Sequence, residues 1–569
     1  MTAIKAYANC DRAHVVWQLD GRVDGCLGFA LYRREGSEGD GEPLDTWVGF
    51  EDDPHALSGT MKPSTEWPIQ KFMWSDFAAP SGQAVSYRVV PMVGTESNLE
   101  PDEAHATDWS NETTATATAD AGYSAYFNRG ILASQWVSRK LQELGGKEIP
   151  TLEDAISKPG PIRSFLAGSV LPKLPSLLEG ASSIYAALYE LNDPELIDHL
   201  VQLGPKANVV LANGADTGAG EDENSDARQT LKNANVNVKD RMVRGRHFAH
   251  NKFLVVCDDA GTPQAVWTGS TNWTKTGLCT QANNALLIED QATAQFYRDE
   301  WDALADAGSD YTAALLANND VERKTTVGTA QEQVFFVVDS DFKDLDRATE
   351  LINGAQHGIL FLFFNPGPSG TLLNAILERS ATSSANFDPS LYIHGVINQD
   401  PSTTKHPVGL FTRGTFQLAP DDVVLPAAIA EDFGFWKQEL LKLPTAHAIV
   451  HSKTIVLDPF GDHPVVMTGS HNLGPKASSQ NDDNLVIVEN APTLAAAYAV
   501  NIMGVYDTYR FRFRRAQAQK AGGNGGGGHP AWHGLQTQDT WQDDYFTGAK
   551  ARELRFWLGQ PEPAPAPPA

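Results

Sequence analysis

The chain has 569 residues, more than one hydrophobic core usually serves, so its length predicts two to four domains. Apolar residues make up 41% and charged residues 20% of the chain, which is typical of a globular protein and excludes an intrinsically disordered one. The formal net charge of −27 disfavours sequence-independent attraction to nucleic-acid phosphates or anionic membranes, although it allows a local basic site.

The sequence also bears on cellular location. No apolar run approaches the roughly 18 residues that a membrane-spanning helix needs. The N-terminus lacks a basic start followed by an apolar stretch, so we expect no secretory signal. Four cysteines without metal-ligand spacing do not form a disulfide framework. We therefore expect a cytoplasmic protein, or one secreted by a route without a signal peptide.

Residues 1–118 are predicted to form an all-β domain. Short β-branched and aromatic runs, separated by Gly, Pro, Ser and Asp clusters, predict strands at 14–19, 28–34, 45–50 and 84–93. The Thr/Ala segment 113–120 is either the last strand or a linker. The pattern resembles a fibronectin type III-like β-sandwich.

From residue 121 the pattern changes to alternating helices and strands, which occur in two cycles. The repetition predicts two α/β/α lobes, at residues 121–318 and 325–515. The elements predicted for the first cycle lie at 171–192, 194–204 and 207–214, and those of the second at 344–357, 358–367 and 372–380.

The C-terminal part, 516–569, is predicted to contain a Gly-rich linker, a docked segment and a Pro-rich tail. GGNGGGGHP (522–530) and PEPAPAPPA (561–569) have the composition of flexible or extended chain. The aromatic residues between 540 and 559 favour docking on a folded domain.

One short sequence motif occurs twice, once in each predicted lobe. HNKFLVVCD occupies 250–258 and HSKTIVLD occupies 451–458, and each is followed eleven residues after its Asp by Gly-Ser-x-Asn. The first copy is one residue longer, and an extra residue in a strand would turn every later side chain to the other face. We therefore predict a β-bulge near 256–257 that keeps Asp258 in register. The alternative is that Cys257 takes the place of the acid.

This pattern resembles the phospholipase D superfamily, whose signature is the HKD motif carried twice, and the likeness covers residues 121–515. The resemblance implies two pseudo-twofold-related α/β/α lobes that build one site, without a metal or a cofactor. Asp258 and Asp458 would be mainly structural. The side chains that the resemblance assigns to catalysis are His250, Lys252, Ser270, Asn272 and Asn283 from the first copy, and His451, Lys453, Ser470, Asn472 and Asp483 from the second.

Cleaving a phosphodiester requires a nucleophile, a proton for the leaving oxygen and positive charge around the other oxygens. Two imidazoles supply the first two, and two lysines, helped by the Ser and Asn side chains, supply the third. If each acid serves the His of its own lobe, Asp483 raises the pKa of His451 and makes it the acid/base, and His250 is the nucleophile. The resemblance implies a covalent phosphohistidine that water or an alcohol displaces.

We expect a phospholipase D-type phosphodiesterase that cleaves a phospholipid head group, or transfers the phosphatidyl group to an alcohol. A nuclease of the same superfamily is the alternative, favoured by the basic stretch 238–252 and opposed by the net charge. A third possibility is an inactive binding or scaffold protein, which the intact His and Lys of both copies oppose. We expect a monomer, because one chain carries both half-sites, with transient contact to a membrane surface.

A metal site is a further alternative, suggested by the spacing of His247 and His250, or of His447 and His451. Four-residue His spacing suits a helix, whereas this segment is predicted to be a strand, so we expect no metal ligand here.

Overall fold

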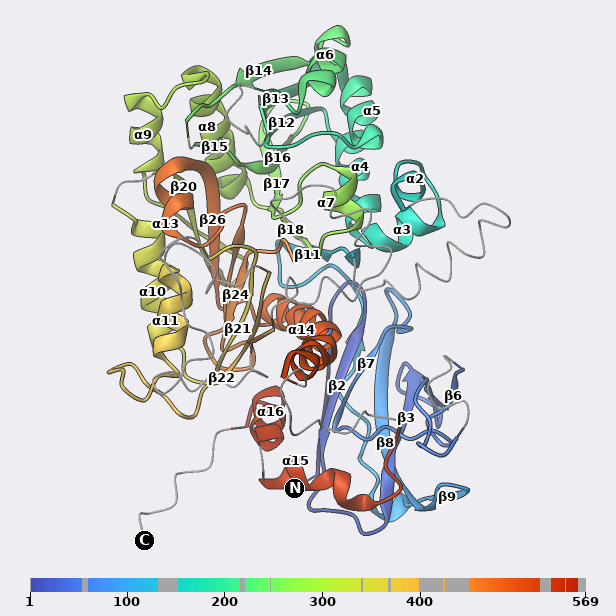
Figure 1. The fold of residues 1–569 in the computed structure, drawn as a ribbon. Coiled ribbons are helices and arrows are strands. Elements are labelled where there is room, and N and C mark those ends of the chain that lie inside the picture. Colours follow the sequence, from blue (N-terminus) through green and yellow to red (C-terminus); the bar gives the residue numbers. More distant parts are fainter. Residues whose placement is uncertain are drawn as a thin grey trace. The chain divides into compact units, whose positions relative to one another are not determined.

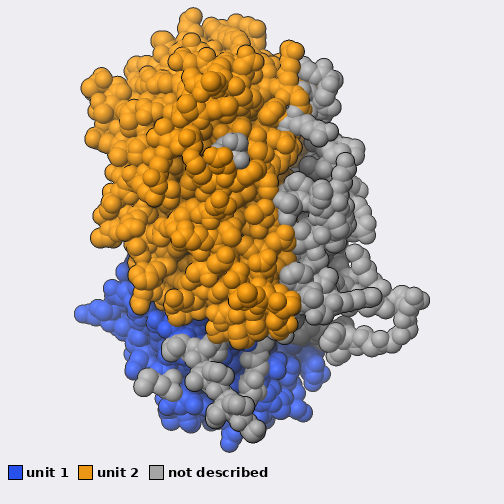
Figure 2. All heavy atoms as spheres, turned by 90° about the vertical axis from the view of Figure 1, so that its left-hand side faces the viewer, with its two compact units in different colours: residues 1–116, 518–569 blue, residues 117–517 orange. Residues whose placement is uncertain are grey.

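The computed structural model divides the chain into two compact units, residues 1–116 with 518–569 and residues 117–517 (Figure 2). The residues it describes are 2–53, 60–130, 152–214, 221–245, 247–338, 341–366, 370–398, 423–424, 450–521, 534–547 and 549–560. The predicted Gly-rich linker at 522–530 and the Pro-rich tail lie outside the described residues.

The N-terminal region is all-β, as predicted, and is built of antiparallel sheets (Figure 1). Its strands are β1 (Ala3–Ala8), β2 (Ala13–Gln18) and β7 (Met73–Asp76) in one sheet, and β10 (Thr113–Thr114), β8 (Ala84–Thr95), β3 (Cys26–Glu35), β4 (Glu42–Pro43) and β9 (Asn98–Pro101) in another. A small third sheet pairs β5 (Asp45–Thr46) with β6 (Lys62–Pro63), and a 3₁₀ turn, η1, covers Glu103–His105. The strand predicted at 45–50 is therefore only two residues long.

The C-terminal segment packs on this β domain through buried aromatic residues. It comprises η7 (Asp539–Gln542), α15 (Asp543–Thr547) and α16 (Ala549–Leu558). The indole of Trp541 donates to the carbonyl of Cys26 at 2.9 Å, and Tyr7 donates its hydroxyl to the carbonyl of Trp557 at 2.6 Å. The aromatic residues that favoured docking thus complete the core of the β domain.

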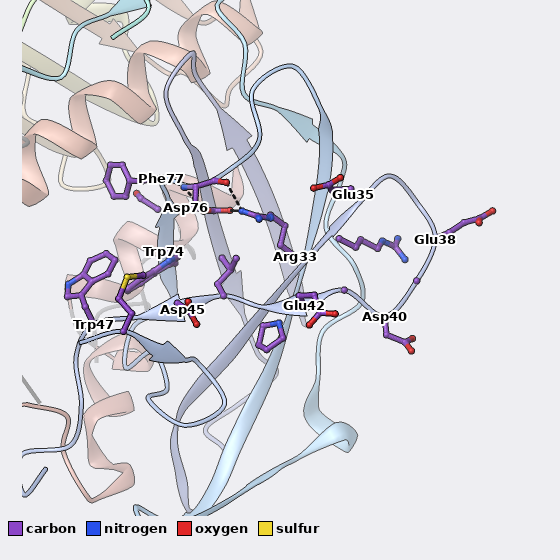
Figure 3. A pocket seen from close by; sticks show the side chains of 18 residues that line it. Arg33, Glu35, Glu38, Asp40, Glu42, Asp45, Trp47, Trp74, Asp76 and Phe77 are labelled. Atoms are coloured by element: carbon purple, nitrogen blue, oxygen red, sulfur yellow. Dashed lines mark hydrogen bonds and ion pairs between the residues drawn. The ribbon is translucent and has the colours of Figure 1, made fainter. Parts of the chain in front are cut away.

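A surface cavity of about 900 Å³ lies on the same unit, between β3, β4 and β7 (Figure 3). Trp47, Trp74 and Phe77 gather at one end of it, and acidic side chains such as Glu38 and Asp40 project at the other. None of the residues predicted to be catalytic lines this cavity, so it is separate from the chemistry discussed below.

The second unit contains two mixed sheets with the same strand order. The first runs β11 (Tyr123–Phe127), β18 (Asn284–Ile288), β17 (Pro263–Gly269), β16 (Lys252–Cys257), β12 (Ser183–Leu188), β13 (Ala207–Ala212) and β14 (Asn237–Arg241). The second runs β19 (Arg323–Val327), β20 (Ala330–Val337), β26 (Asn481–Glu489), β25 (Val465–Gly469), β24 (Thr454–Leu457), β21 (Gly358–Phe363), β22 (Tyr392–Ile397) and β23 (Val423–Val424).

Helices cover both faces of the sheets, so each lobe has the predicted α/β/α layering (Figure 1). In the first lobe α8 packs on β16 and β17, and the indole of Trp301 in α8 donates to the carbonyl of Ala186 in β12. The helices of the first lobe are α2 (Leu152–Ile156), α3 (Pro161–Ala167), α4 (Val170–Gly180), α5 (Pro194–Leu203), α6 (Ser225–Asn233), α7 (Lys275–Cys279), α8 (Gln291–Ala307) and α9 (Ala313–Asn319), with a 3₁₀ turn, η3 (Gly204–Lys206). Those of the second are α10 (Lys343–Gly354), α11 (Thr371–Glu378), α13 (Pro475–Gln480) and α14 (Pro492–Ala521).

Local sequence signals set the ends of the elements that frame the site. In α5, Asp193 accepts a hydrogen bond from the amide of Leu196, Pro194 occupies the first turn, and Gly204 ends the helix with a φ of +54°. Asp193 and Pro194 thus mark where the connection from β12 to α5 ends, and that connection carries residues of the site.

Candidate active site

The chain that leads into each motif histidine pairs with the opposite lobe. Strand β15 (Phe248–Ala249) runs parallel to the start of β26, and the amide of His250 donates to the carbonyl of Asp482 at 2.9 Å. In the reciprocal contact, the amide of His451 donates to the carbonyl of Ala282 at 2.9 Å. Each histidine is therefore held at the seam between the lobes by the backbone of the other lobe.

The same pairing between the lobes brings a hydrogen-bond partner to each imidazole. Nδ1 of His250 lies 2.7 Å from Oδ1 of Asp483, and Nδ1 of His451 lies 3.0 Å from Oδ1 of Asn283. The assumption that each acid serves the histidine of its own lobe is wrong, and so is the raised pKa of His451 expected from it. The pairing crosses because residues 281–283 and 481–483 lie directly beside the incoming chain of the opposite lobe.

These contacts fix the proton positions on both rings. Asp483 can only accept when ionised, and His451 also points Nδ1 at the carbonyl of Ser270 at 3.1 Å. Nδ1 therefore carries the hydrogen in both rings, and Nε2 is the nitrogen left for a substrate. An acceptor of the opposite lobe thus gives each imidazole the same tautomer.

The two motif serines support the partners of the imidazoles. Ser470 donates its hydroxyl to Asp483 at 2.7 Å, and Ser270 donates its hydroxyl to Asn283 at 2.8 Å. Both serines are fully buried. Their hydroxyl hydrogens are therefore committed to these side chains, not to a phosphoryl oxygen as predicted, and their role here is to position Asp483 and Asn283.

Burial lowers the pKa of both imidazoles. The pKa of His250 falls to about 4, because desolvation outweighs the charge of Asp483, which acts to raise it. The pKa of His451 lies well below its ordinary value, since burial and the charge of Lys453 act together. Burial alone would raise the pKa of Asp483, but the contact with His250 brings it below its ordinary value. At neutral pH the free site therefore holds two neutral rings and an ionised Asp483.

The two lysines occupy matching positions beside the rings. Lys252 donates to the carbonyl of His250 and Lys453 to that of His451, both at 2.6 Å. Each ammonium also lies 4.9 Å from the centre of an aromatic ring, Tyr189 in the first lobe and Phe364 in the second. The strands begin only at Lys252 and Thr454, so each His-x-Lys stands at a strand start and not inside a strand as predicted.

The two motif acids are not equivalent. Between β16 and β17 the register shifts after Val256, as predicted, but the extra residue is Gln264 on the partner strand. Cys257 therefore takes the place that Asp458 has in the second lobe, and the prediction that a bulge keeps Asp258 in register is wrong. Asp258 instead accepts hydrogen bonds within its own hairpin, from the amides of Ala260 and Thr262.

Asp458, in contrast, holds the start of a central strand. Its two carboxylate oxygens accept the amides of residues 356, 357 and 358 at 2.7–2.8 Å, immediately before β21. We expect Asp458→Asn to lower the free energy of unfolding by about 1–3 kcal/mol, because an amide group would face N–H donors. Asp258→Asn should cost less than about 1 kcal/mol, since its hairpin is partly exposed.

Urea unfolding of the two variants beside the wild type tests this difference. Asn tolerates the φ of +46° at Asp458, so the substitution isolates the hydrogen bonds from backbone strain. Equal losses in the two variants would contradict the structural role assigned to Asp458 alone.

Sequence reasoning missed one charged residue of the site, Glu190. Asn272 donates its amide to Oε2 of Glu190 at 2.7 Å, so one of its two N–H hydrogens is committed to this carboxylate and not to a phosphate as predicted. Glu190 lies two residues after β12, and an acid just beyond the end of a central strand was the available signal. In the second lobe Asn472 is also partly buried, and its Oδ1 has no hydrogen-bond partner among the described residues.

The basic stretch before His250 contributes less positive charge to the surface than its sequence indicates. Arg241 is buried and forms an ion pair with Asp482 of the second lobe. Its Nη2 donates to Oδ1 of Asp482 at 3.0 Å. Arg244 is exposed. The stretch thus serves partly to join the lobes.

Within the described part of the chain, no group of three or more His, Cys, Asp or Glu side chains could hold a metal ion. His247 lies against the carbonyl of Gln480 at 2.7 Å, and His447 lies outside the described residues. None of the described helices combines the length and the apolar character that crossing a bilayer requires.

Comparison with known proteins locates a family domain over this site. Residues 176–305 and 435–503 match the family model described as cardiolipin synthase, PLD-like domain, and these segments contain both histidines and both lysines. No match was found among curated proteins.

Solved structures of low identity are similar to parts of the chain. Phosphatidylserine synthase from Haemophilus influenzae Rd KW20 has 11% identity and a TM-score of 0.41, over 62% of this chain and 90% of that one. Nuc from Salmonella typhimurium, a phospholipase D family member, has 22% identity and a TM-score of 0.21, over 26% and 91%. Polyphosphate kinase from Porphyromonas gingivalis has 12% identity and a TM-score of 0.38, over 65% and 55%.

Proposed function

From the premise that the chain contains a phospholipase D-like domain, we propose that it is a phosphodiesterase that cleaves the head-group phosphodiester of a phospholipid. The observation that carries the proposal is the reciprocal seam. Two neutral imidazoles, each with Nδ1 bound to an acceptor of the opposite lobe, stand beside two buried lysines. When a bound phosphodiester favours the protonated forms of His451 and of the lysines, such a set supplies a nucleophile, a proton donor and two cations for one phosphate.

In the proposed reaction Nε2 of His250 attacks phosphorus, and the bond from phosphorus to the leaving oxygen breaks. His451 gives the proton on its Nε2 to that oxygen. Water then loses a proton to His451 and displaces His250, which releases the phosphate product and restores both rings. The charge of the bound phosphodiester opposes the desolvation of His451 and raises its pKa toward a range in which it carries the proton.

The assignment of His250 as nucleophile rests on a different reason from the one the sequence suggested. Asp483 lies against His250, and a carboxylate there stabilises the positive charge that the ring acquires when the nitrogen–phosphorus bond forms. Asn283 is neutral, so it orients His451 without holding its proton as firmly. His451 is thus the more readily deprotonated ring, which suits an acid.

A nuclease remains the alternative substrate assignment, and the structure adds no observation in its favour. The most buried basic residue of the stretch before His250 is already paired. The net charge of −27 also opposes binding of a polyanion.

The decisive assay measures head-group release from phosphatidylcholine and phosphatidylethanolamine vesicles beside cleavage of single- and double-stranded DNA. We expect release from the lipids, no cleavage of DNA, and loss of release in His250→Asn. Cleavage of DNA without lipid turnover would contradict the proposed phospholipase activity and favour a nuclease. If neither substrate is cleaved, the inactive scaffold is favoured.

The pH dependence tests the role of the lysines. Burial lowers the pKa of Lys252 to about 7, although Asp483 and Glu190 act to raise it. An ammonium is charged below its pKa and neutral above it, so kcat/KM for a soluble phosphodiester should fall as pH rises through about 7. A profile that stays flat up to the ordinary lysine range, about pH 10, would contradict the proposed need for a charged Lys252.

A further inference from the structure

Besides Asp483 and Asn283, a second pair of equivalent positions differs in charge between the two half-sites. Tyr189 and Phe364 are equivalent, because their rings lie 4.7 Å from His250 and 4.8 Å from His451 in the same edge-on manner. The residue that follows is Glu190 in the first lobe and Asn365 in the second. One side of the site is therefore acidic where the other is neutral.

The position of Glu190 is fixed by its surroundings. The connection from β12 to α5 pairs with the chain after the motif, since Leu191 forms a bridge with Trp273 and the amide of Asn192 donates to the carbonyl of Trp273. Asn272 holds one oxygen of Glu190 at 2.7 Å. Burial lowers the pKa of both Lys252 and Lys453, and the charge of Glu190 opposes this shift on each of them.

Two acceptor oxygens at this place lack a donor. Oε1 of the half-buried Glu190 has no hydrogen-bond partner among the described residues, nor has Oδ1 of Asn272, which is 4% exposed. A second carboxylate, Glu223, acts electrostatically on Glu190. A buried acceptor that meets no protein donor, such as Oδ1 of Asn272, is ordinarily satisfied by water or a ligand. A ligand group that satisfies these would carry hydrogen-bond donors and positive charge.

We propose that Glu190 makes the site selective for a phosphodiester whose head group carries an ammonium, an inference that rests on the proposed function. The two lysines hold the phosphate, and Glu190 with the oxygen of Asn272 receives the ammonium beside it. A carboxylate next to the phosphate repels a further anion. The same residue therefore selects against a neutral glycerol head group and against the neighbouring phosphates of a nucleic acid.

The test compares pairs of substrates in which one member carries an ammonium and the other does not. Short-chain phosphatidylethanolamine and phosphatidylglycerol in monomeric solution avoid the surface charge of a vesicle. 2-Aminoethyl 4-nitrophenyl phosphate and its ethyl analogue test recognition of an ammonium beside the phosphate without a lipid. In this pair nitrophenolate leaves and the aminoethyl or ethyl group stays on phosphorus. The enzymes are the wild type, Glu190→Gln, and Glu179→Gln as control, because Glu179 is an exposed residue before the opposite end of β12.

We expect the wild type to prefer the ammonium substrate of each pair in kcat/KM by about tenfold or more, as for a hydrogen bond between charged groups. Glu190→Gln should remove most of this preference, and Glu179→Gln should keep it. Equal losses on both substrates of a pair would show that Glu190 only positions Asn272, and a wild-type preference for the neutral substrate would also overturn the inference.

The outcome separates the inference from the proposed function. If the nitrophenyl esters show the preference and its loss while neither lipid is cleaved, the phospholipid assignment fails and the selectivity stands. If both lipids are cleaved at equal rates by the wild type, the phospholipase stands and the selectivity fails. If the wild type cleaves none of the four, both fail.

Discussion

Replacing His250 by asparagine should lower kcat by about four orders of magnitude or more, as loss of a nucleophile does in other covalent mechanisms. No phosphorylated protein should form. Replacing His451 by asparagine should have a different effect with a 4-nitrophenyl ester, because nitrophenolate leaves without a proton. This variant should release about one equivalent of nitrophenolate in a burst and then stall with a phosphohistidine.

Peptide mapping after a short incubation with labelled substrate locates the phosphoryl group. The expected site is His250 in the His451→Asn variant. Both variants keep the backbone hydrogen bonds that hold the histidines to the opposite lobe, so their folding can be compared with that of the wild type. Label on His451, or a burst in His250→Asn but not in His451→Asn, would exchange the two roles.

Replacing Asp483 by asparagine should lower kcat by about three orders of magnitude, close to the effect of removing the orienting acid of a catalytic triad. Asparagine can still accept the hydrogen bonds of His250 and Ser470, so the loss reflects the missing charge beneath the phosphorylated ring. The burst rate with a 4-nitrophenyl ester measures this step directly.

The matched control is Asn283→Asp, which adds a carboxylate beside His451. It should raise the pKa of His451 and change kcat by about tenfold or less, since no charge is lost at the nucleophile. A larger loss in Asn283→Asp than in Asp483→Asn would mean that His451, not His250, carries the phosphoryl group.

The fold of the second unit was predictable because the sequence contains the same pattern of elements twice. A hydrophobic strand, the motif, a hairpin and Gly-Ser-x-Asn recur at nearly constant spacing, and the structure has two sheets of equal strand order. The all-β N-terminal region was also predictable from its alternation and turn residues. Strands of two residues, such as β5, leave too little periodicity to be located.

The pairing of Asp483 with His250 could not be predicted. Spacing along the chain does not show that β15, which leads into His250, pairs with β26 of the other lobe. The place of Asp258 was mispredicted for a related reason. An extra residue can be absorbed on either strand of a hairpin, and the tight contact of Asp458 with the start of β21 has no counterpart at Asp258.

Glu190 was missed because it lies sixty residues before His250 in the chain and only the fold brings it to Asn272. The serines were placed in the site correctly but given the wrong partners. A hydroxyl beside a motif histidine suggests contact with substrate, whereas Ser270 and Ser470 are buried beneath the side chains that orient the rings.

The central claim is that the two half-sites close around one phosphorus atom. A crystal structure of the full chain soaked with tungstate, which mimics a phosphate, tests it most directly. We predict one ion in contact with Nε2 of both His250 and His451 and with the ammonium groups of Lys252 and Lys453. Two separate ions, or ring nitrogens too far apart to touch the same ion, would contradict the claim.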